Sequence, residues 1–488
     1  MAKQRITISP ITRLEGHGRI ELFLDSKGSL ENAYFQVPEL RGFERFCVGR
    51  LAEDMPALTS RICGVCPEAH HLCSTKALDK LFKVEPTRVA KKLRELFYSA
   101  YYIYDHILHF YILASPDFVV GLDAKPEERN ILGVIKKVGL EVAKEVIKHR
   151  AYGQRVLEIL GGKTIHPTFG LLGGVSKGLN EEERAEIEKI ASSSIEFAKF
   201  SIALWKDKLL PAYKELILND GYKLETYYMG LVDESNKINF YDGKIRVVSP
   251  DNKEYAKFEV DNYLEHIAER VEPWSYCKFP YLKKLGWKGL EASKDSGIYR
   301  VGPLARVNAS EGFATKLANE EYKKFYEFFN CKPVHNTLAY HWARLIEILY
   351  AAERLLELTQ DKEITGKEIR TYPKSEEKES EGIGVIEAAR GTLIHHYVAD
   401  ENKLIKKVNL IVATTHNNAP ISISIKEAAK SLIKEGKVDK GILNKIEVAF
   451  RAYDPCFACA THFLPGHMPL AVNIYNANKK LIRKIANF

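Results

Sequence analysis

Two cysteine pairs of the form Cys-x-x-Cys lie near opposite ends of the chain. The first pair is Cys63 and Cys66 in RICGVCPEAHH, and the second is Cys456 and Cys459 in DPCFACATH. Thiolates three positions apart on a turn can point at one ion, so each pair can supply half of a four-sulfur site. A fold that uses both halves must bring the two ends of the chain together, which constrains its whole architecture.

The residues around the first pair favour a thiolate. Pro67 suits the first turn of a helix, which would place Cys66 at the N-terminal end of that helix. Free backbone amides and the helix dipole stabilise negative charge at such a position. The sequence thus places one potential metal ligand where its ionised form is favoured.

Three other interpretations of the pairs remain open on the residues alone. Each pair could be a separate redox dithiol, the four residues could form a structural zinc site, or they could be ordinary core cysteines. Zinc modules usually hold their halves about 15–20 residues apart, and the repeated spacing argues against ordinary core residues. We favour a thiolate-rich transition-metal site that joins both ends of the fold. The other cysteines have no motif and are expected to be core or surface residues: Cys47, Cys73, Cys277 and Cys331.

Length and charge exclude some classes of protein. The 488 residues, 45% of them hydrophobic, can bury a large core, as one layered body or as roughly two to four units. The net charge is +8, but both signs are interleaved, as in EEERAEIEKI at 181–190, so we expect no nucleic-acid partner. The N-terminus lacks an apolar core segment, and no run of about 18 apolar residues follows. We therefore expect neither a signal peptide nor a membrane span.

Hydrophobic periodicity predicts a mainly α fold with β-rich parts, of the α+β class: a bundle of long helices, an N-terminal β-sheet and a small β-containing lobe. Residues 5–40 alternate apolar and polar positions, which predicts strands. Apolar residues at three- and four-residue spacing predict helices of an antiparallel bundle at 87–116, 130–160, 180–218 and 314–360, the last broken at Pro333. The lobe is predicted from 220–300, with a hairpin signal at Asp242-Gly243, and 361–382 is predicted to be an exposed loop.

The two cysteine motifs match a known pattern. RICGVCPEAH resembles the first signature of nickel–iron hydrogenase large subunits, and DPCFACATH resembles the second. The similarity extends to ITRLEGHG at 11–18, RGFERFCVGR at 41–50, DHILHFY at 105–111, YRVGPLARVN at 299–308 and EAARGTLIHH at 387–396. With its length and the ATTHNN stretch at 413–418, the chain is most similar to the cytoplasmic, methyl-viologen-reducing enzymes of methanogens. These enzymes feed heterodisulfide reductase and do not reduce deazaflavin.

The resemblance implies a nickel–iron centre held by the four cysteines. Cys63 and Cys456 match the terminal nickel ligands, and Cys66 and Cys459 match the ligands that bridge to iron. The iron would also carry carbon monoxide and cyanide. His70 would donate a hydrogen bond to a cysteine sulfur from outside the ligand set.

A magnesium site is also implied. Glu44 matches a glutamate that binds Mg2+ together with the histidine that ends the second signature, here His462. A carboxylate oxygen suits magnesium, whereas the histidine ligand is implied by the resemblance alone.

Splitting dihydrogen into a hydride and a proton needs a hydride acceptor and a base, and the metals would take the hydride. Cys456 matches the thiolate that accepts the proton, and Glu15 matches the glutamate that relays it. Arg390 matches an arginine over the open metal face, flanked by Asp105 and Asp454. On the residues alone, Glu15 could be a surface carboxylate and Arg390 a structural ion pair. A proline usually precedes this arginine, where the present chain has alanine, and His106, His109, His395 and His396 are expected to be structural.

The implied partners follow from what this chain lacks. No further cysteine cluster is present in the sequence, so we expect no iron–sulfur cluster in this chain. The resemblance implies a small subunit with iron–sulfur clusters, an electron-transfer subunit, heterodisulfide reductase or ferredoxin beyond it, and a cytoplasmic location. It also implies nickel-insertion factors and a maturation protease, which would cut after His462.

We expect residues 1–488 to form a single large-subunit body. Its parts are N-terminal strands and a loop to the first metal motif (1–60), a helical bundle (61–219 and 314–360), the β-rich lobe (220–300), active-site loops with the second metal motif (383–462) and a cleavable C-terminal extension (463–488). Alternatives in function stay open: a deazaflavin-, NAD(P)- or sulfur-reducing hydrogenase, a metal-free structural subunit like that of complex I, or a zinc-stapled structural protein.

Overall fold

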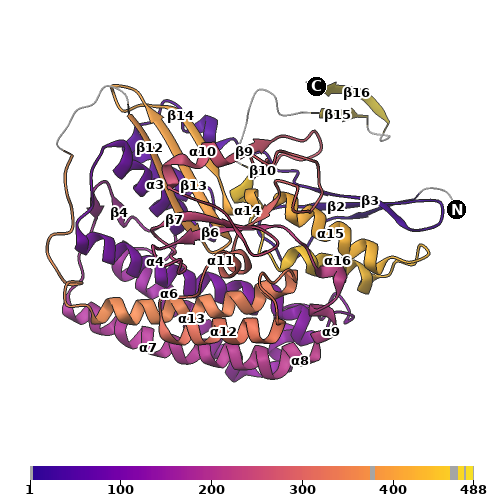
Figure 1. The fold of residues 1–488 in the computed structure, drawn as a ribbon, viewed down its shortest axis with the longest axis horizontal. Coiled ribbons are helices and arrows are strands. Elements are labelled where there is room, and N and C mark those ends of the chain that lie inside the picture. The colour runs from indigo at the N-terminus through magenta and orange to yellow at the C-terminus, as the bar shows by residue number, and fades with distance from the viewer. Residues whose placement is uncertain (1–3, 374–379, 462–470, 477–479, 487–488) are drawn as a thin grey trace.

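The computed structural model describes residues 4–373, 380–461, 471–476 and 480–486. It is mainly helical with several small sheets, which confirms the predicted fold class. In Figure 1 the long helices form one layer, and the sheets and shorter helices lie over it. None of the helices in the described part of the chain is long and apolar enough to cross a membrane.

Four long helices dominate the bundle: α4 (Arg88–Leu108), α6 (Leu140–Gly161), α7 (Glu181–Leu204) and α13 (Tyr340–Gln360). Their starts follow from local chemistry. Thr87 accepts a hydrogen bond from the amide of Ala90 at 3.1 Å, and Asn180 forms a reciprocal capping box with Glu183. Helix α13 packs against both α7 and α4, so it lies at the centre of the layer.

Three of the predicted helix boundaries need correction. The helix predicted at 130–160 is two helices, α5 (Ile131–Val138) and α6, because Gly139 takes a φ of 89° between them. The helix predicted to end near Pro116 continues in π-helical turns, η2 (His109–Ala114) and η3 (Pro116–Val120). Pro116 lies in the first turn of η3, where its missing amide costs no hydrogen bond. The helix predicted to reach 218 changes at Leu204 into a π turn, η4 (Trp205–Leu209), followed by α8 (Leu210–Ala212) and α9 (Lys214–Ile217).

The break at Pro333 is confirmed. Helix α12 (Lys316–Phe329) ends at Asn330, which has a left-handed backbone, and α13 begins after η7 (Thr337–Ala339).

The N-terminal strands form an antiparallel sheet in the order β1-β2-β3, as predicted: β1 (Gln4–Ile8), β2 (Arg19–Leu24) and β3 (Leu30–Gln36). Alternate residues such as Ile20, Leu22 and Phe35 are fully buried. Strand β3 packs on α15 (Asn418–Leu432), next to α16 (Lys440–Arg451). The first and last parts of the chain therefore share one core.

The β-rich lobe is present, but its predicted hairpin is wrong. Its main sheet has the order β11-β6-β7-β8, from β6 (Tyr227–Val232), β7 (Lys244–Val248), β8 (Glu254–Phe258) and β11 (Tyr299–Arg300), beside a β9 (Ile267–Arg270) and β10 (Phe279–Leu282) pair. Strand β7 pairs with β6, not with the residues just before Asp242. Those residues leave the sheet because Phe240 stacks on Tyr102 of α4, with ring centres 3.7 Å apart.

A further antiparallel sheet of three strands, β12 (Ser380–Ala388), β13 (Gly391–Ala399) and β14 (Ile405–Ile411), occupies much of the first part of 383–462, where we expected active-site loops. Helix α3 (Pro67–Leu81) packs closely on β12, and a side chain at Gly384 would lie 2.1 Å from the carbonyl oxygen of Cys73. The predicted loop at 361–382 is also not wholly exposed, because Ile364 is fully buried and β12 begins at Ser380.

The remaining described elements are short. They are α1 (Phe43–Phe46), η1 (Ala52–Asp54), α2 (Met55–Ser60), β4 (Gly170–Leu171), β5 (Gly174–Val175), η5 (Asp220–Tyr222), η6 (Val260–Asn262), α10 (Tyr263–His266), α11 (Pro303–Ala309), α14 (Ala413–His416), α17 (Phe457–Ala460), β15 (Ala471–Tyr475) and β16 (Leu481–Ala486).

Candidate metal centre

The two cysteine pairs meet. The four sulfur atoms of Cys63, Cys66, Cys456 and Cys459 lie within 4.8 Å of one another, and all four residues are buried. Cys63 and Cys456 have sulfurs 3.3 Å apart, as do Cys66 and Cys459. No other group of three or more histidine, cysteine, aspartate or glutamate side chains converges in this way in the described parts of the chain. Separate redox dithiols are therefore excluded, and the joined site is confirmed.

Each pair sits at the start of a helix. Cys66 caps α3, as predicted from Pro67, and Cys456 caps α17. The sulfur of Cys63 accepts hydrogen bonds from the amides of Val65 and Cys66 at 3.2 and 3.4 Å. Amides at a helix start are ordinary anion partners, so the local backbone favours a thiolate at this corner of the cluster.

The sulfurs also interact with one another. Hydrogen bonds from Cys456, Cys459 and Cys66 lower the pKa of Cys63 well below its usual value, whereas burial raises the pKa of Cys456 and Cys459 well above it. The protein alone therefore favours ionisation of Cys63 over that of Cys456 and Cys459. Binding a soft divalent metal would displace the remaining protons, and thiolates of this number suit nickel, iron or zinc. The donor set fits the expected nickel–iron group.

The N-terminal segment closes over the second pair. The thiol of Cys456 donates to Oε2 of Glu15 at 2.9 Å, and the amide of Ala458 donates to the same oxygen at 3.1 Å. Gly16 permits this approach, because its φ is 84° and a side chain there would lie 2.8 Å from the amide nitrogen of Ala458. Burial, with a smaller contribution from the charge of Cys63, raises the pKa of Glu15 above its usual value. This carboxyl group is thus disposed to hold a proton beside the sulfur.

Glu15 also faces a cavity. The cavity has a volume of about 520 Å3 and is lined by Glu15, Gly16, His17, Glu39, Leu40, Arg41, Arg61, Ile62, Gly64 and Ala458. His17 is exposed and its Nδ1 pairs with Oε1 of Glu39. Glu15 therefore lies between a buried cysteine and a polar opening.

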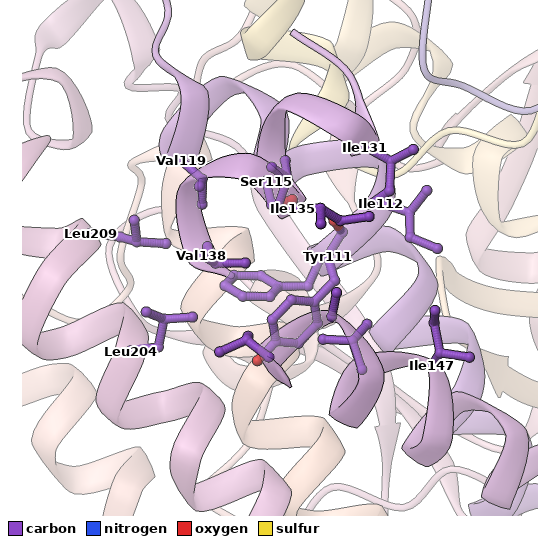
Figure 2. Close-up of a pocket in the computed structure, with 15 residues that line it drawn as sticks. Tyr111, Ile112, Ser115, Val119, Ile131, Ile135, Val138, Ile147, Leu204 and Leu209 are labelled. Carbon is purple, nitrogen blue, oxygen red and sulfur yellow. The ribbon is translucent and has the colours of Figure 1, made fainter. Parts of the chain in front are cut away.

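A second cavity has a different character. It measures about 150 Å3 and lies among η2, η3, α5 and α6, where almost every lining side chain is apolar (Figure 2). Figure 2 shows Val119, Ile135 and Val138 on its walls, with Tyr111 and Ser115 beside them. It offers no cluster of groups that could perform acid–base or metal chemistry.

Arg390 lies in the turn between β12 and β13 and is buried. Its guanidinium donates to both carboxylate oxygens of Asp105 at 2.9 and 3.0 Å, and it lies 3.1 Å from Asp454. Burial alone would lower the pKa of Arg390, but Asp105 and Asp454 raise it well above its usual value. Arg390 is therefore held as a fixed cation, and the predicted ion pairs are present.

The alanine that replaces the usual proline before Arg390 has a structural consequence. The amide of Ala389 donates to the hydroxyl of Tyr101 at 3.3 Å, which a proline could not do. The carbonyl of Ala389 accepts from Arg306 at 3.0 Å. The turn is thus tied down by hydrogen bonds in place of a proline ring.

The structure leaves one predicted contact unformed, the bond from His70 to a cysteine sulfur, and describes only one partner of the predicted magnesium pair. His70 contacts Nε2 of His395 through its Nδ1 at 3.1 Å, and its own Nε2 has no hydrogen-bond partner in the described parts of the chain. The bond to a cysteine sulfur is therefore absent here. Glu44 is buried and accepts from the amide of Leu410 at 2.7 Å, with the ammonium of Lys278 at 3.5 Å. Burial raises the pKa of Glu44 to about 7, and His462 lies outside the described residues.

The four histidines expected to be structural all have partners. His106 bonds to Glu347 at 2.8 Å, His109 to the carbonyl of Arg451 at 2.9 Å, and His395 to the hydroxyl of Tyr397 at 2.6 Å. His396 bonds to Glu381 at 2.6 Å.

Two contributors to the site were missed from the sequence. Arg41 donates to the carbonyl of Ala458 at 3.0 Å and also to that of Ile62, so it ties the two cysteine segments together. Thr414 accepts from the amide of Cys456 at 3.0 Å. Arg41 lies in RGFERFCVGR and Thr414 in ATTHNN. Both stretches resemble hydrogenase large subunits, and this resemblance was the sequence signal that could have pointed to the two residues.

Comparison with known proteins decides the family. The chain matches the nickel-dependent hydrogenase family over residues 41–133 and 216–462, and a HoxL-like family over residues 5–40. The chain is the large subunit of a nickel–iron hydrogenase. As such it is an oxidoreductase acting on dihydrogen, and the zinc-stapled and metal-free structural alternatives are excluded.

Several hydrogenases resemble it over nearly their whole length. An F420-non-reducing hydrogenase iron-sulfur subunit of Archaeoglobus profundus is 49% identical, covering 99% of this chain and 100% of that protein. The corresponding vhu-type subunit of an F420-non-reducing hydrogenase from Methanocaldococcus jannaschii is 46% identical, covering 88% of this chain and 100% of that protein. Among solved structures, an NAD+-reducing nickel–iron hydrogenase in its H2-reduced state has a TM-score of 0.88 at 37% identity, covering 94% of this chain and 99% of that one.

Proposed function

We propose that this subunit oxidises dihydrogen for an F420-independent electron pathway, through an iron–sulfur partner chain to heterodisulfide reductase or ferredoxin. The observation that carries the catalytic part is the buried cluster of four sulfurs, with Glu15 on one side and Arg390 nearby. The F420-non-reducing relatives support the choice of electron pathway.

The four cysteines would hold the metals in the roles set by motif position. Cys63 and Cys456 would be terminal nickel ligands, and Cys66 and Cys459 would bridge nickel to an iron that also carries carbon monoxide and cyanide. When bound, this group supplies the two-electron redox chemistry that dihydrogen oxidation requires.

Proton movement would use the protein's own groups. Cys456 would take the proton released from dihydrogen, and Glu15 would receive it across the 2.9 Å contact. The cavity in front of Glu15 would then admit water to carry the proton away. Arg390, held as a cation by Asp105 and Asp454, cannot act as the base and would contribute a fixed positive charge.

Electrons would leave on the same side of the subunit. Large apolar side chains are exposed in the segment that begins at the cavity: Leu40, Phe46, Val48 and Leu51. They follow one another in sequence beside Arg41, which lines the cavity. Exposed apolar groups beside arginine are typical of protein interfaces, and we assign this surface to the iron–sulfur partner.

Magnesium binding and maturation would involve the end of the chain. Glu44 would supply a buried carboxylate for Mg2+, with His462 as its partner after processing.

The hairpin of β15 and β16 lies apart from the body in Figure 1 and falls within the predicted extension. We propose that a maturation protease, acting after nickel insertion, cleaves the chain on the C-terminal side of His462. Intact mass of the active subunit tests this, since a chain that still carries Phe488 would refute the cut.

A second electron acceptor is suggested by one comparison, because the similar solved structure is an NAD+-reducing enzyme. The purified complex should be assayed under dihydrogen with methyl viologen, with ferredoxin plus heterodisulfide reductase, with F420 and with NAD+. We expect reduction of the first two alone. Reduction of F420 or NAD+ at a comparable rate would contradict the proposed pathway.

A further inference from the structure

One buried carboxylate joins the two segments that form the Glu15–Cys456 contact. Asp117, on η3, accepts from Nη2 of Arg13 at 2.5 Å through one oxygen and from Nη1 of Arg451 at 2.5 Å through the other. Asp117 is 1% exposed. Charge-assisted hydrogen bonds in a buried setting are among the strongest that side chains make.

The two arginines stand next to the residues that meet. Arg13 precedes Glu15 in the N-terminal segment, and Arg451 ends α16 shortly before Cys456. Both segments leave regular structure at this point, since Arg13 and Asp454 have φ angles of 59°. Such left-handed conformations cost non-glycine residues roughly 1–2 kcal/mol each, so they persist only where the surroundings hold them.

Neighbouring contacts fix the geometry of this junction. Arg13 also donates to the carbonyl of Leu113 at 3.1 Å, and Arg451 donates to Glu447 at 2.5 Å. Asn444 donates to Asp117 at 3.3 Å. Asn444 of α16 thus holds the carboxylate, while Leu113 of η2 and Glu447 of α16 hold the two arginines.

We infer that Asp117 is a positioning residue, which sets the distance between Glu15 and Cys456 by anchoring Arg13 and Arg451. The inference rests on the proton route proposed above. Proton transfer needs donor and acceptor within hydrogen-bond reach, and a displacement of about 1 Å can cost on the order of 100-fold in rate. In the described part of the chain, the side chain of Asp117 forms hydrogen bonds with Arg13, Arg451 and Asn444 and has Arg129 at 4.0 Å. Of these partners, Arg13 and Arg451 belong to the segments that meet, so the effect of Asp117 on Glu15 and Cys456 would pass through them.

Two variants of the purified complex test this. Asp117→Asn removes the charge at constant size, and Arg13→Gln cuts the N-terminal link while leaving the pair between Asp117 and Arg451. Asp79→Asn is the matched control, because Asp79 is a buried carboxylate paired with Arg94 at 2.5 Å near the far end of α3.

The first readout compares two reactions of dihydrogen in each variant. Exchange of hydrogen isotopes with solvent requires the proton route, whereas conversion of para- to ortho-dihydrogen within the site does not. We expect the ratio of exchange to conversion to fall by about tenfold or more in both variants, with nickel content unchanged, and to stay constant in the control.

The second readout does not depend on turnover. Amide hydrogen exchange followed by mass spectrometry should be faster in residues 11–18 of both variants and unchanged in residues 19–36. If Asp117→Asn fails to take up nickel, the ratio and the amide exchange of Arg13→Gln decide whether Asp117 is a positioning residue.

The outcomes distinguish the positioning role from the proton route. If both nickel-loaded variants keep the wild-type ratio, or if exchange and conversion fall together, Asp117 has no positioning role. If Glu15→Gln itself leaves the ratio unchanged in the same assay, the proton route is wrong instead.

Discussion

The thiol of Cys456 donates a hydrogen bond to the carboxylate of Glu15 at 2.9 Å, across 441 positions of sequence. The contact joins the N-terminal segment to the second cysteine pair, while Cys63 and Cys66 complete the cluster from the start of α3. The metal centre therefore exists only when both ends of the chain are folded together, and metal binding should be coupled to the stability of the whole subunit.

Replacing Glu15 with Gln should block proton exchange and spare the metals. Glutamine keeps an oxygen near Cys456 but cannot carry a proton to the cavity, so solvent isotope exchange should fall by about 100-fold or more. Nickel and iron contents should match the wild type. Glu21→Gln is the control, since Glu21 is a buried glutamate near the same end of the chain that pairs with Arg5 and Arg19. Normal exchange in Glu15→Gln would show that the route is wrong.

Replacing Cys456 with Ala should abolish nickel retention and activity, because the proposed terminal nickel ligand and the proposed proton acceptor would be lost together. Elemental analysis of the purified subunit measures this. Cys73→Ala provides the comparison, since Cys73 is a buried thiol that donates to the carbonyls of Gly384 and Leu393 and lies outside the cluster. Equal nickel in both variants would contradict the ligand assignment.

Replacing Arg390 with Lys should keep a positive charge but lose the fork that grips both oxygens of Asp105. We expect turnover to fall by about 100-fold with the metals retained, as for other fixed charges near a reacting centre. The rate of dihydrogen-dependent viologen reduction per bound nickel is the measurement. A near-wild-type rate would mean that a cation of either shape suffices.

Stability should fall in mild acid because of buried neutral histidines. His71 accepts from the amide of Gly170 at 2.8 Å through Nε2, and burial lowers its pKa to about 4. Burial also lowers the pKa to about 4 at His70, His106 and His335. Histidine in an unfolded chain titrates near pH 6.5, so the unfolded state binds more protons and acid favours unfolding. Each such group should lower the free energy of unfolding by about 1.5 kcal/mol between pH 6.5 and 5.

The measurement is the melting temperature of the complex from pH 7.5 to 5. The histidines lower it below pH 6.5, whereas buried carboxyl groups with a raised pKa, such as Glu44 and Glu68, act in the opposite direction. The contribution of one histidine is therefore read from His71→Gln, which should reduce the acid-induced fall relative to the wild type while lowering the starting value. The same pH dependence in His71→Gln and the wild type would contradict the account.

The sequence predicted the four-cysteine cluster and the main helices because both leave local signals. Cys-x-x-Cys spacing and helical periodicity survive in any context, and caps such as Thr87 mark where helices begin. The hairpin at Asp242-Gly243 was wrong because a long-range contact decided it: Phe240 stacks on Tyr102, which no short window of sequence contains. The π turns after Leu108 and the buried carboxylate of Asp117 escaped prediction for the same reason, since each depends on packing between distant segments.

The role of Arg41 illustrates a further limit. Its two carbonyl partners, on Ile62 and Ala458, belong to separate cysteine motifs. The stretch RGFERFCVGR resembles the family but assigns no partner to Arg41, and only the meeting of the two chain ends gives it a bridging position.

The most direct test of the central claim is the nickel and iron content of the purified complex, combined with infrared spectroscopy of the same sample. We predict one nickel and one site iron held by the four cysteines of this chain, with bands from iron-bound carbon monoxide and cyanide. An active preparation that contains zinc in place of nickel, or that lacks those bands, would contradict the account.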